Sequence, residues 1–136
     1  MSRTVRTVPA ILTDDPIELG KMVAAAERFT DFAQFDIMDG RFVPSTSVTA
    51  ADIASLRTLL TWEAHLMVVR PEQQLAALKE AGAGRIIFHV EAVPYPDMVI
   101  RQIRELGMEA GLAVNPDTGI EKVTPWVEAI DHVLFM

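Results

Sequence analysis

The chain has 136 residues, a formal net charge of -7, 50% hydrophobic residues and no cysteine. This length suits one domain with a sizeable core, and the lack of cysteine excludes disulfides and thiolate metal sites. The negative charge argues against nucleic acid or an anionic membrane as the main partner, and no apolar stretch reaches the roughly 18 residues of a membrane span. We therefore expect a globular cytoplasmic protein that holds any metal by histidine and carboxylate side chains.

Apolar runs alternate with helical patterns along the first half of the chain. Residues 8–12 predict a strand, and Asp14 or Asp15 followed by Pro16 predicts the start of a helix whose apolar positions continue to Phe29. The pattern then predicts a strand at 32–38, a helix at 48–60 and a strand at 62–69.

The same alternation continues to the last residue. We expect helices at 71–81, 96–106 and 119–127, and strands at 85–90, 110–114 and 132–136. Six strands alternating with five helices predict an α/β fold with a parallel sheet. We expect one domain, too short for a complete (β/α)8 barrel, which needs at least roughly 200 residues. The open edge of the last strand invites association with another copy of the chain.

Asp36 and His65 are the leading candidates for chemistry. Each lies in an apolar strand pattern, and the carboxyl ends of parallel strands converge on one pocket. Read alone, His65 is equally a buried core histidine or a ligand. Asp39, which precedes a glycine, is expected to form a turn, and His89 is expected to be a structural hydrogen-bonding residue. We expect His132 to be a surface or turn residue.

Several motifs occur in a characteristic order: Pro9-Ala-Ile-Leu12, Phe35-Asp-Ile-Met-Asp-Gly40, Phe42-Val-Pro44, His65-Leu-Met67, Pro71-Glu72, His89-Val-Glu-Ala92, Gly111-Leu-Ala-Val-Asn-Pro116 and Val133-Leu-Phe-Met136. Together they resemble the ribulose-phosphate 3-epimerase family over essentially the whole chain. The resemblance implies a fold of the (β/α)8 TIM-barrel type with about six units present, so that residues 1–136 form one partial barrel domain. The resemblance implies a sugar-phosphate substrate and interconversion of ribulose 5-phosphate and xylulose 5-phosphate by proton transfer at C3. Two acid/base groups on opposite faces of the carbon are needed, assisted by a divalent metal.

The resemblance also assigns residues. Asp36 matches one catalytic aspartate, which also binds the metal, and His65 matches a metal-binding histidine. Three methionines, Met38, Met67 and Met136, match residues that line the substrate pocket, although methionine is also a common core filler. Asn115 follows the fifth predicted strand, where its amide either orients a sugar hydroxyl or begins a turn.

The chain departs from the family at several pocket positions. Gln34 replaces the first histidine of the His-x-Asp-x-Met-Asp-Gly motif, so a Zn, Fe or Mn ion should be held more weakly, with Gln34 as a poor third ligand. Ala10, Arg41 and Ser45 replace a serine, a histidine and an asparagine. The second aspartate and the phosphate-binding turns of the family lie beyond these six units.

Two alternatives to an epimerase follow. A non-catalytic remnant or interaction module would keep the fold and use the open strand edge for pairing, and Gln34 and Ala10 favour it. A related group of decarboxylases and hexulose-phosphate synthases uses an Asp-x-Lys-x-x-Asp pattern. Met38 stands where that lysine is required, which argues against this group.

Overall fold

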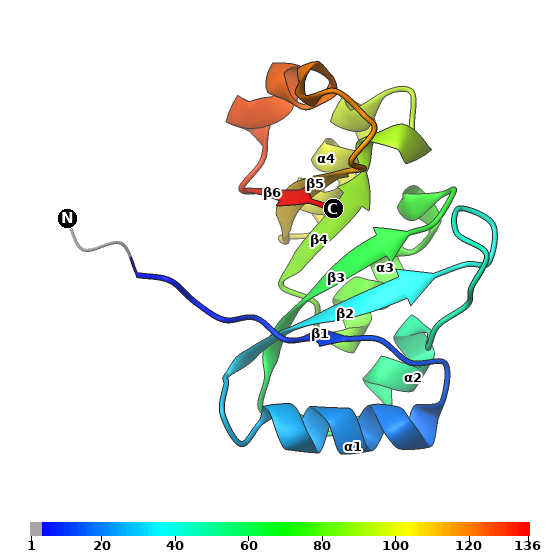
Figure 1. Ribbon diagram of the computed structural model, residues 1–136, viewed down its shortest axis with the longest axis vertical. Helices are drawn as coiled ribbons and strands as arrows, with labels where there is room; N and C mark the ends of the chain where they lie inside the picture. The colour runs from blue at the N-terminus through cyan, green and yellow to red at the C-terminus, as the bar shows by residue number, and fades with distance from the viewer. Residues whose placement is uncertain (1–3) are drawn as a thin grey trace.

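The computed structural model describes residues 4–136, in which six parallel strands form a single curled sheet. The strands pair in chain order, and the sheet forms a half-barrel with helices on its outer face (Figure 1). The predicted α/β fold, a partial (β/α)8 barrel, is confirmed. The strands are β1 (Ala10–Ile11), β2 (Phe32–Met38), β3 (Thr61–Met67), β4 (Arg85–His89), β5 (Glu109–Val114) and β6 (His132–Phe135).

Helices and 3₁₀ turns connect these strands. Asp15 begins the first helix as predicted, because its carboxylate accepts a hydrogen bond of 2.8 Å from Ile17 N and Pro16 follows at the first helical position. No helix in residues 4–136 has the length and hydropathy to span a bilayer. The α-helices are α1 (Pro16–Ala26), α2 (Ala50–Ala54), α3 (Leu75–Ala81) and α4 (Pro96–Glu105), and the 3₁₀ turns are η1 (Pro71–Gln73), η2 (Val90–Ala92), η3 (Ile120–Lys122) and η4 (Thr124–Ala129).

The helix predicted at 48–60 is much shorter in the structure. Thr49 and Asp52 form a capping box that begins α2 at Ala50, but the helix ends at Ala54. Beyond it, Thr58 Oγ1 and Leu59 N both donate to Glu27 Oε1, at 2.6 and 3.0 Å. The chain here is therefore bound to the end of α1 instead of continuing its own helical hydrogen bonds.

Other boundaries also differ from the predictions. The first strand contains two residues instead of five, the helix predicted at 71–81 divides into η1 and α3, and the segment predicted at 119–127 forms η3 and η4. Gly82 ends α3 as expected, with a left-handed φ of 107° that a residue with a Cβ adopts only at a cost.

The two faces of the sheet have different residues. Successive side chains of a strand point to opposite faces, and the outer face buries large apolar residues against the helices. These include Phe35, Ile37, Leu66, Ile86, Phe88 and Leu112. Buried polar residues occupy the alternating positions and therefore lie on the inner face; they are Asp36, Glu63, His65 and His89.

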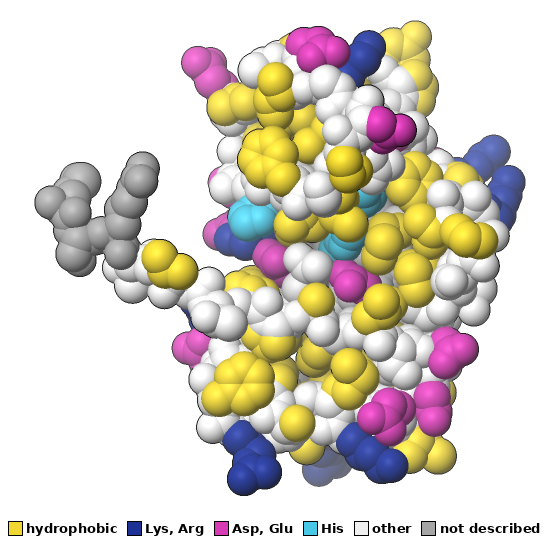
Figure 2. All heavy atoms as spheres, in the orientation of Figure 1, with side chains coloured by type: hydrophobic (Ala, Val, Ile, Leu, Met, Phe, Trp, Pro, Cys, Tyr) yellow, Lys and Arg dark blue, Asp and Glu magenta, His cyan; other side chains and the backbone are white. Residues whose placement is uncertain are grey.

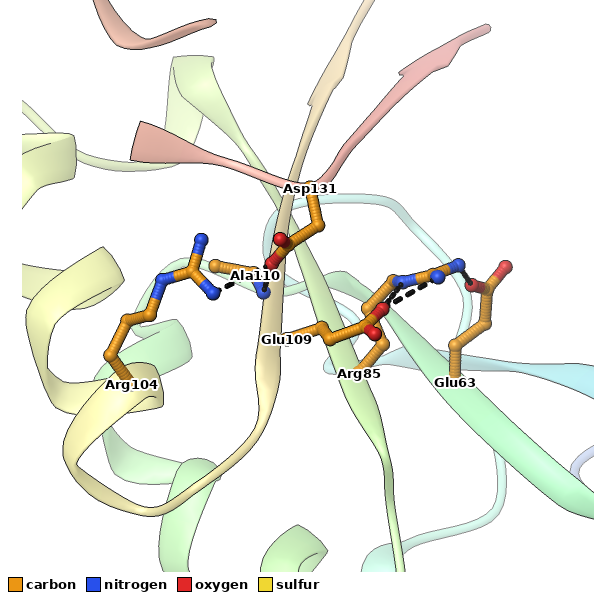
Figure 3. A network of polar contacts seen from close by, with 6 residues as sticks. All are labelled: Glu63, Arg85, Arg104, Glu109, Ala110 and Asp131. Carbon is orange, nitrogen blue, oxygen red and sulfur yellow. Dashed lines mark hydrogen bonds and ion pairs between the residues drawn. The ribbon is translucent and has the colours of Figure 1, made fainter. Parts of the chain in front are cut away.

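A charged network crosses the inner face near the amino ends of three strands (Figure 3). Arg85 donates to Glu63 Oε2 at 2.7 Å and to Glu109 Oε2 at 2.7 and 2.9 Å. Burial alone would lower the pKa of Arg85, but its hydrogen bonds to Glu109 and Glu63 raise it overall. Arg104 and Asp131 form a neighbouring ion pair at 2.8 Å, and Asp131 also accepts from Ala110 N.

Candidate active site

Asp36 and His65 are neighbours on the inner face of the half-barrel. They are paired in register across β2 and β3, and His65 Nδ1 lies 3.0 Å from Asp36 Oδ1. Both are buried, with 8% of Asp36 and 2% of His65 exposed. On the face seen in Figure 2, histidine side chains lie near the middle among hydrophobic ones. The structure thus brings together the two residues that the sequence singles out.

Gln34 belongs to the same group. It lies two residues before Asp36 in β2 and so shares its face, and its Nε2 donates to Asp36 Oδ1 at 2.9 Å. Rotation of the amide exchanges its nitrogen and oxygen without a change of shape, so Gln34 can present either a donor or an acceptor here.

His89 and Glu91 extend this contact toward β5. His89 Nε2 lies 2.8 Å from His65 Nε2, and His89 Nδ1 lies 3.5 Å from Glu91 Oε2. Although His89 Nδ1 is buried, it makes no hydrogen bond within residues 4–136. Glu91 Oε1 accepts from Asn115 N at 2.5 Å. The sequence predicts the hydrogen-bonding role of His89 but misses Glu91, for which the His89-Val90-Glu91 spacing is a local signal.

The environment of His89 favours the neutral imidazole. Burial lowers the pKa of His89, repulsion by His65 lowers it further, and Glu91 opposes both effects only in part. A neutral imidazole carries one N–H group, so only one of its two nitrogens can donate.

Asp39 organises the loop that follows β2. Its Oδ1 accepts hydrogen bonds of 2.8 Å from Arg41 N and Phe42 N, and its Oδ2 accepts one of 2.8 Å from Val69 N. The predicted turn-forming role of Asp39 is confirmed. The loop places the Phe42 ring against His89, with 5.0 Å between the ring centroids.

The four residues predicted to bind substrate lie in two separate parts of the structure. Met38 and Met67 pair in register at the ends of β2 and β3, and Met67 is buried. Asn115 and Met136 line a small separate cavity at the ends of β5 and β6, where half of Met136 is exposed. Asn115 is connected to His65 only indirectly, through Glu91 and His89. The substrate-binding roles of these four residues stay predictions.

Asp36 and His65 are suitable as part of a metal site. Their facing oxygen and nitrogen are 3.0 Å apart, close to the roughly 3.3 Å between two tetrahedral ligands of a zinc ion. The amide of Gln34 adjoins the same carboxylate oxygen. Within residues 4–136 no three His, Asp or Glu side chains converge as metal ligands. Asp36 and His65 are thus two donors, fewer than the three or four protein ligands of a usual zinc site.

The fold and the site define a class of protein: a parallel (β/α) barrel that places a carboxylate and an imidazole side by side on its inner face. Residues 6–136 match the model of the ribulose-phosphate 3-epimerase family. The chain is 36% identical to ribulose-phosphate 3-epimerase of Synechocystis, an alignment that covers 100% of this chain and 61% of that protein.

A second relative is ribulose-phosphate 3-epimerase of Schizosaccharomyces pombe, 33% identical over 96% of this chain and 60% of that protein. The chloroplast ribulose-5-phosphate-3-epimerase of Arabidopsis thaliana is 35% identical, over 94% of this chain and 47% of the relative. The chain belongs to the ribulose-phosphate 3-epimerase family. It spans about 60% of the length of the first two of these relatives.

Proposed function

We propose that the chain supplies one acid/base group and part of the metal site for 3-epimerisation of a ketopentose phosphate. The observation that carries this proposal is the 3.0 Å contact between Asp36 and His65, within the two motifs that resemble the family. Ribulose 5-phosphate and xylulose 5-phosphate are the proposed substrate and product.

Asp36 is the proposed base. Its Oδ1 contacts Gln34 Nε2 at 2.9 Å and His65 Nδ1 at 3.0 Å, so the group is held in one orientation with 8% of its surface exposed. A carboxylate in this position can remove the C3 proton from one face of the sugar and return it. Inversion needs a second group on the opposite face, and Asp36 supplies only one.

A divalent ion, Zn, Fe or Mn, is the proposed cofactor. Asp36 and His65 would hold it, with the oxygen of a rotated Gln34 amide as a weaker third donor. When bound, such an ion polarises the sugar carbonyl as a Lewis acid and so makes the C3 proton easier to remove. Because an amide replaces an imidazole at position 34, we expect weaker metal binding than in a site with histidine there.

A solvent-exchange assay tests this function. Ribulose 5-phosphate is incubated with the 136-residue chain and Zn(II) in D₂O, and NMR follows loss of the C3 proton signal. We expect exchange at C3 without net formation of xylulose 5-phosphate, because residues 4–136 bring only one carboxylate to His65. Asp36→Asn should slow the exchange at least about 100-fold, whereas the exposed Asp97→Asn should have no effect.

The other outcomes are equally informative. A folded chain that shows no exchange favours the non-catalytic alternative, a remnant or interaction module. Net epimerisation by the pure chain contradicts the expectation of a single base. Exchange that persists in Asp36→Asn contradicts the role proposed for this carboxylate.

A further inference from the structure

Three rings form a continuous series, from His65 through His89 to Phe42. The centroids of the His65 and His89 rings are 5.0 Å apart, and those of the His89 and Phe42 rings are also 5.0 Å apart. His89 is 1% exposed, whereas Phe42 is only partly buried. The imidazoles therefore lie inside the protein, and the hydrophobic ring of Phe42 lies between them and the surface.

The series runs toward the carboxyl edge of the sheet. His65 is paired with Ile87 in β4, and His89 lies two residues farther along that strand, about 7 Å closer to its carboxyl end. Phe42 belongs to the loop that follows β2, beyond this edge. His89 is thus contacted by His65 from the amino side and by Phe42 from the carboxyl side, from which ligands enter parallel barrels.

The loop that carries Phe42 crosses the end of β3. Because β3 lies between β2 and β4 in the sheet, the chain from the end of β2 to the Phe42 ring spans two strand spacings, roughly 10 Å. Met67, the last residue of β3, lies beside His89 in this region. The loop therefore covers the carboxyl ends of the strands that bear Asp36, His65 and His89.

Hydrogen bonds hold Phe42 in this place. Asp39 Oδ1 accepts from Phe42 N at 2.8 Å, and Asp39 Oδ2 accepts from Val69 N, which follows β3, also at 2.8 Å. Within the loop, Gly40 N donates to Ser45 O at 3.0 Å. The loop is thus anchored to both strands whose ends it covers, and the ring is a fixed cover.

We propose that Phe42 is a positioning residue that shields the Asp36–His65 pair from bulk water by covering His89. Without the ring, solvent would reach His89 from the carboxyl edge and compete for its contact with His65, which measures 2.8 Å between the Nε2 atoms. Exclusion of water also strengthens the electrostatic interactions inside a site. The role in the reaction rests on the proposed function, whereas the shielding does not.

Chemical labelling of histidine tests the shielding independently of activity. Diethyl pyrocarbonate modifies accessible imidazoles, and mass spectrometry of peptides locates the label. In the wild-type chain, the partly exposed His132 should react faster than the buried His65 and His89. In Phe42→Ala, His89 should react at least about tenfold faster, because local opening then exposes it more often. Phe42→Leu keeps an apolar side chain over the ring and should keep the protection.

Tyr95→Ala is the matched control. Tyr95 is an aromatic residue in the segment between η2 and α4, and 67% of its surface is exposed. Its removal should leave the labelling of His89 unchanged, and circular dichroism should show the same fold in all variants. Equal labelling of His89 in Phe42→Ala and wild type overturns the shielding. Equal acceleration in Tyr95→Ala also overturns it, because the effect is then a general loosening of the chain.

The solvent-exchange assay tests the role in the reaction. Phe42→Ala should lower kcat for exchange at C3 about tenfold with little change in KM, because Phe42 acts through His89 and does not hold the substrate. Phe42→Leu should restore most of the rate. An unchanged kcat in Phe42→Ala overturns the positioning role. A wild-type chain without exchange contradicts the proposed function and this role together, and the labelling result then decides the shielding alone.

Discussion

Asp39 shows how much one carboxylate can contribute to the shape of this site. It accepts three backbone hydrogen bonds, two from its own loop and one from Val69 after β3, and so joins two neighbouring strand ends. Burial opposes ionisation of Asp39, but the hydrogen bonds from Val69, Phe42 and Arg41 outweigh it and lower the pKa below the usual value of 3.8.

We therefore predict that Asp39→Ala destabilises the fold by about 2 to 3 kcal/mol at pH 7, since charged acceptors of backbone N–H groups are lost. A pKa lowered by folding gives stability that is present above the unfolded value of about 3.9 and is lost as the pH falls through the folded value. In urea unfolding, the difference between variant and wild type should hold down to about pH 4 and narrow below it. The exposed Asp117→Ala serves as control, and a difference that is independent of pH contradicts this account.

Contacts between residues that lie opposite each other in neighbouring strands were predicted better than contacts between residues that do not. Asp36 and His65 follow from their strand positions, because register in a parallel sheet sets them side by side. The partnership of His65 with His89 does not follow, because it joins residues that are not opposite each other: His65 is paired with Ile87. Its existence depends on strand curvature and side-chain rotamers, which periodicity does not encode.

Helices and strands were also predicted well only where local interactions determine them. β2 matches its predicted bounds, because most of its seven residues are apolar and Asp31 and Asp39 lie on either side of it. The expected helix at 48–60 fails after Ala54 because Glu27, far away in the sequence, binds Thr58 and Leu59. A local pattern predicts an element only where no distant group competes for its backbone.

The ion pairs that join β3, β4 and β5 compensate a buried charge and should therefore contribute to stability. Arg85 is the partner of Glu63, whose side chain is only 4% exposed, so removal of Arg85 leaves a buried charge uncompensated. We expect Arg85→Met to cost about 3 kcal/mol in denaturant unfolding. The double variant Arg85→Met with Glu63→Leu should recover most of this loss, because no buried charge then remains.

Glu109 offers the matched comparison. It binds the same guanidinium but its side chain is 54% exposed, so Glu109→Gln should cost less than about 1 kcal/mol. Equal losses in the single Arg85 variant and the double variant would show that packing of the arginine side chain, and not the charge of Glu63, sets the cost.

At the scale of the whole molecule, the sheet has two edges. Within residues 4–136, β1 pairs only with β2 and β6 only with β5, so one side of each edge strand has free backbone groups. β6 also carries Phe135, whose surface is 68% exposed. Unprotected edges of this kind pair with other strands, and charged residues such as lysine normally prevent this. The edge strand β6 of a second copy has the same free backbone groups, so two copies can pair through this edge.

We therefore predict concentration-dependent self-association of the 136-residue chain through β6, measured by sedimentation velocity. Phe135→Lys should weaken it about tenfold, which corresponds to about 1.4 kcal/mol, because a charge then lies at the pairing edge. Phe29→Lys is the control: Phe29 is also 68% exposed but lies in the turn that follows α1. Equal effects of both substitutions would point to general hydrophobic association, whereas loss of association in Phe135→Lys alone would assign it to the edge of β6.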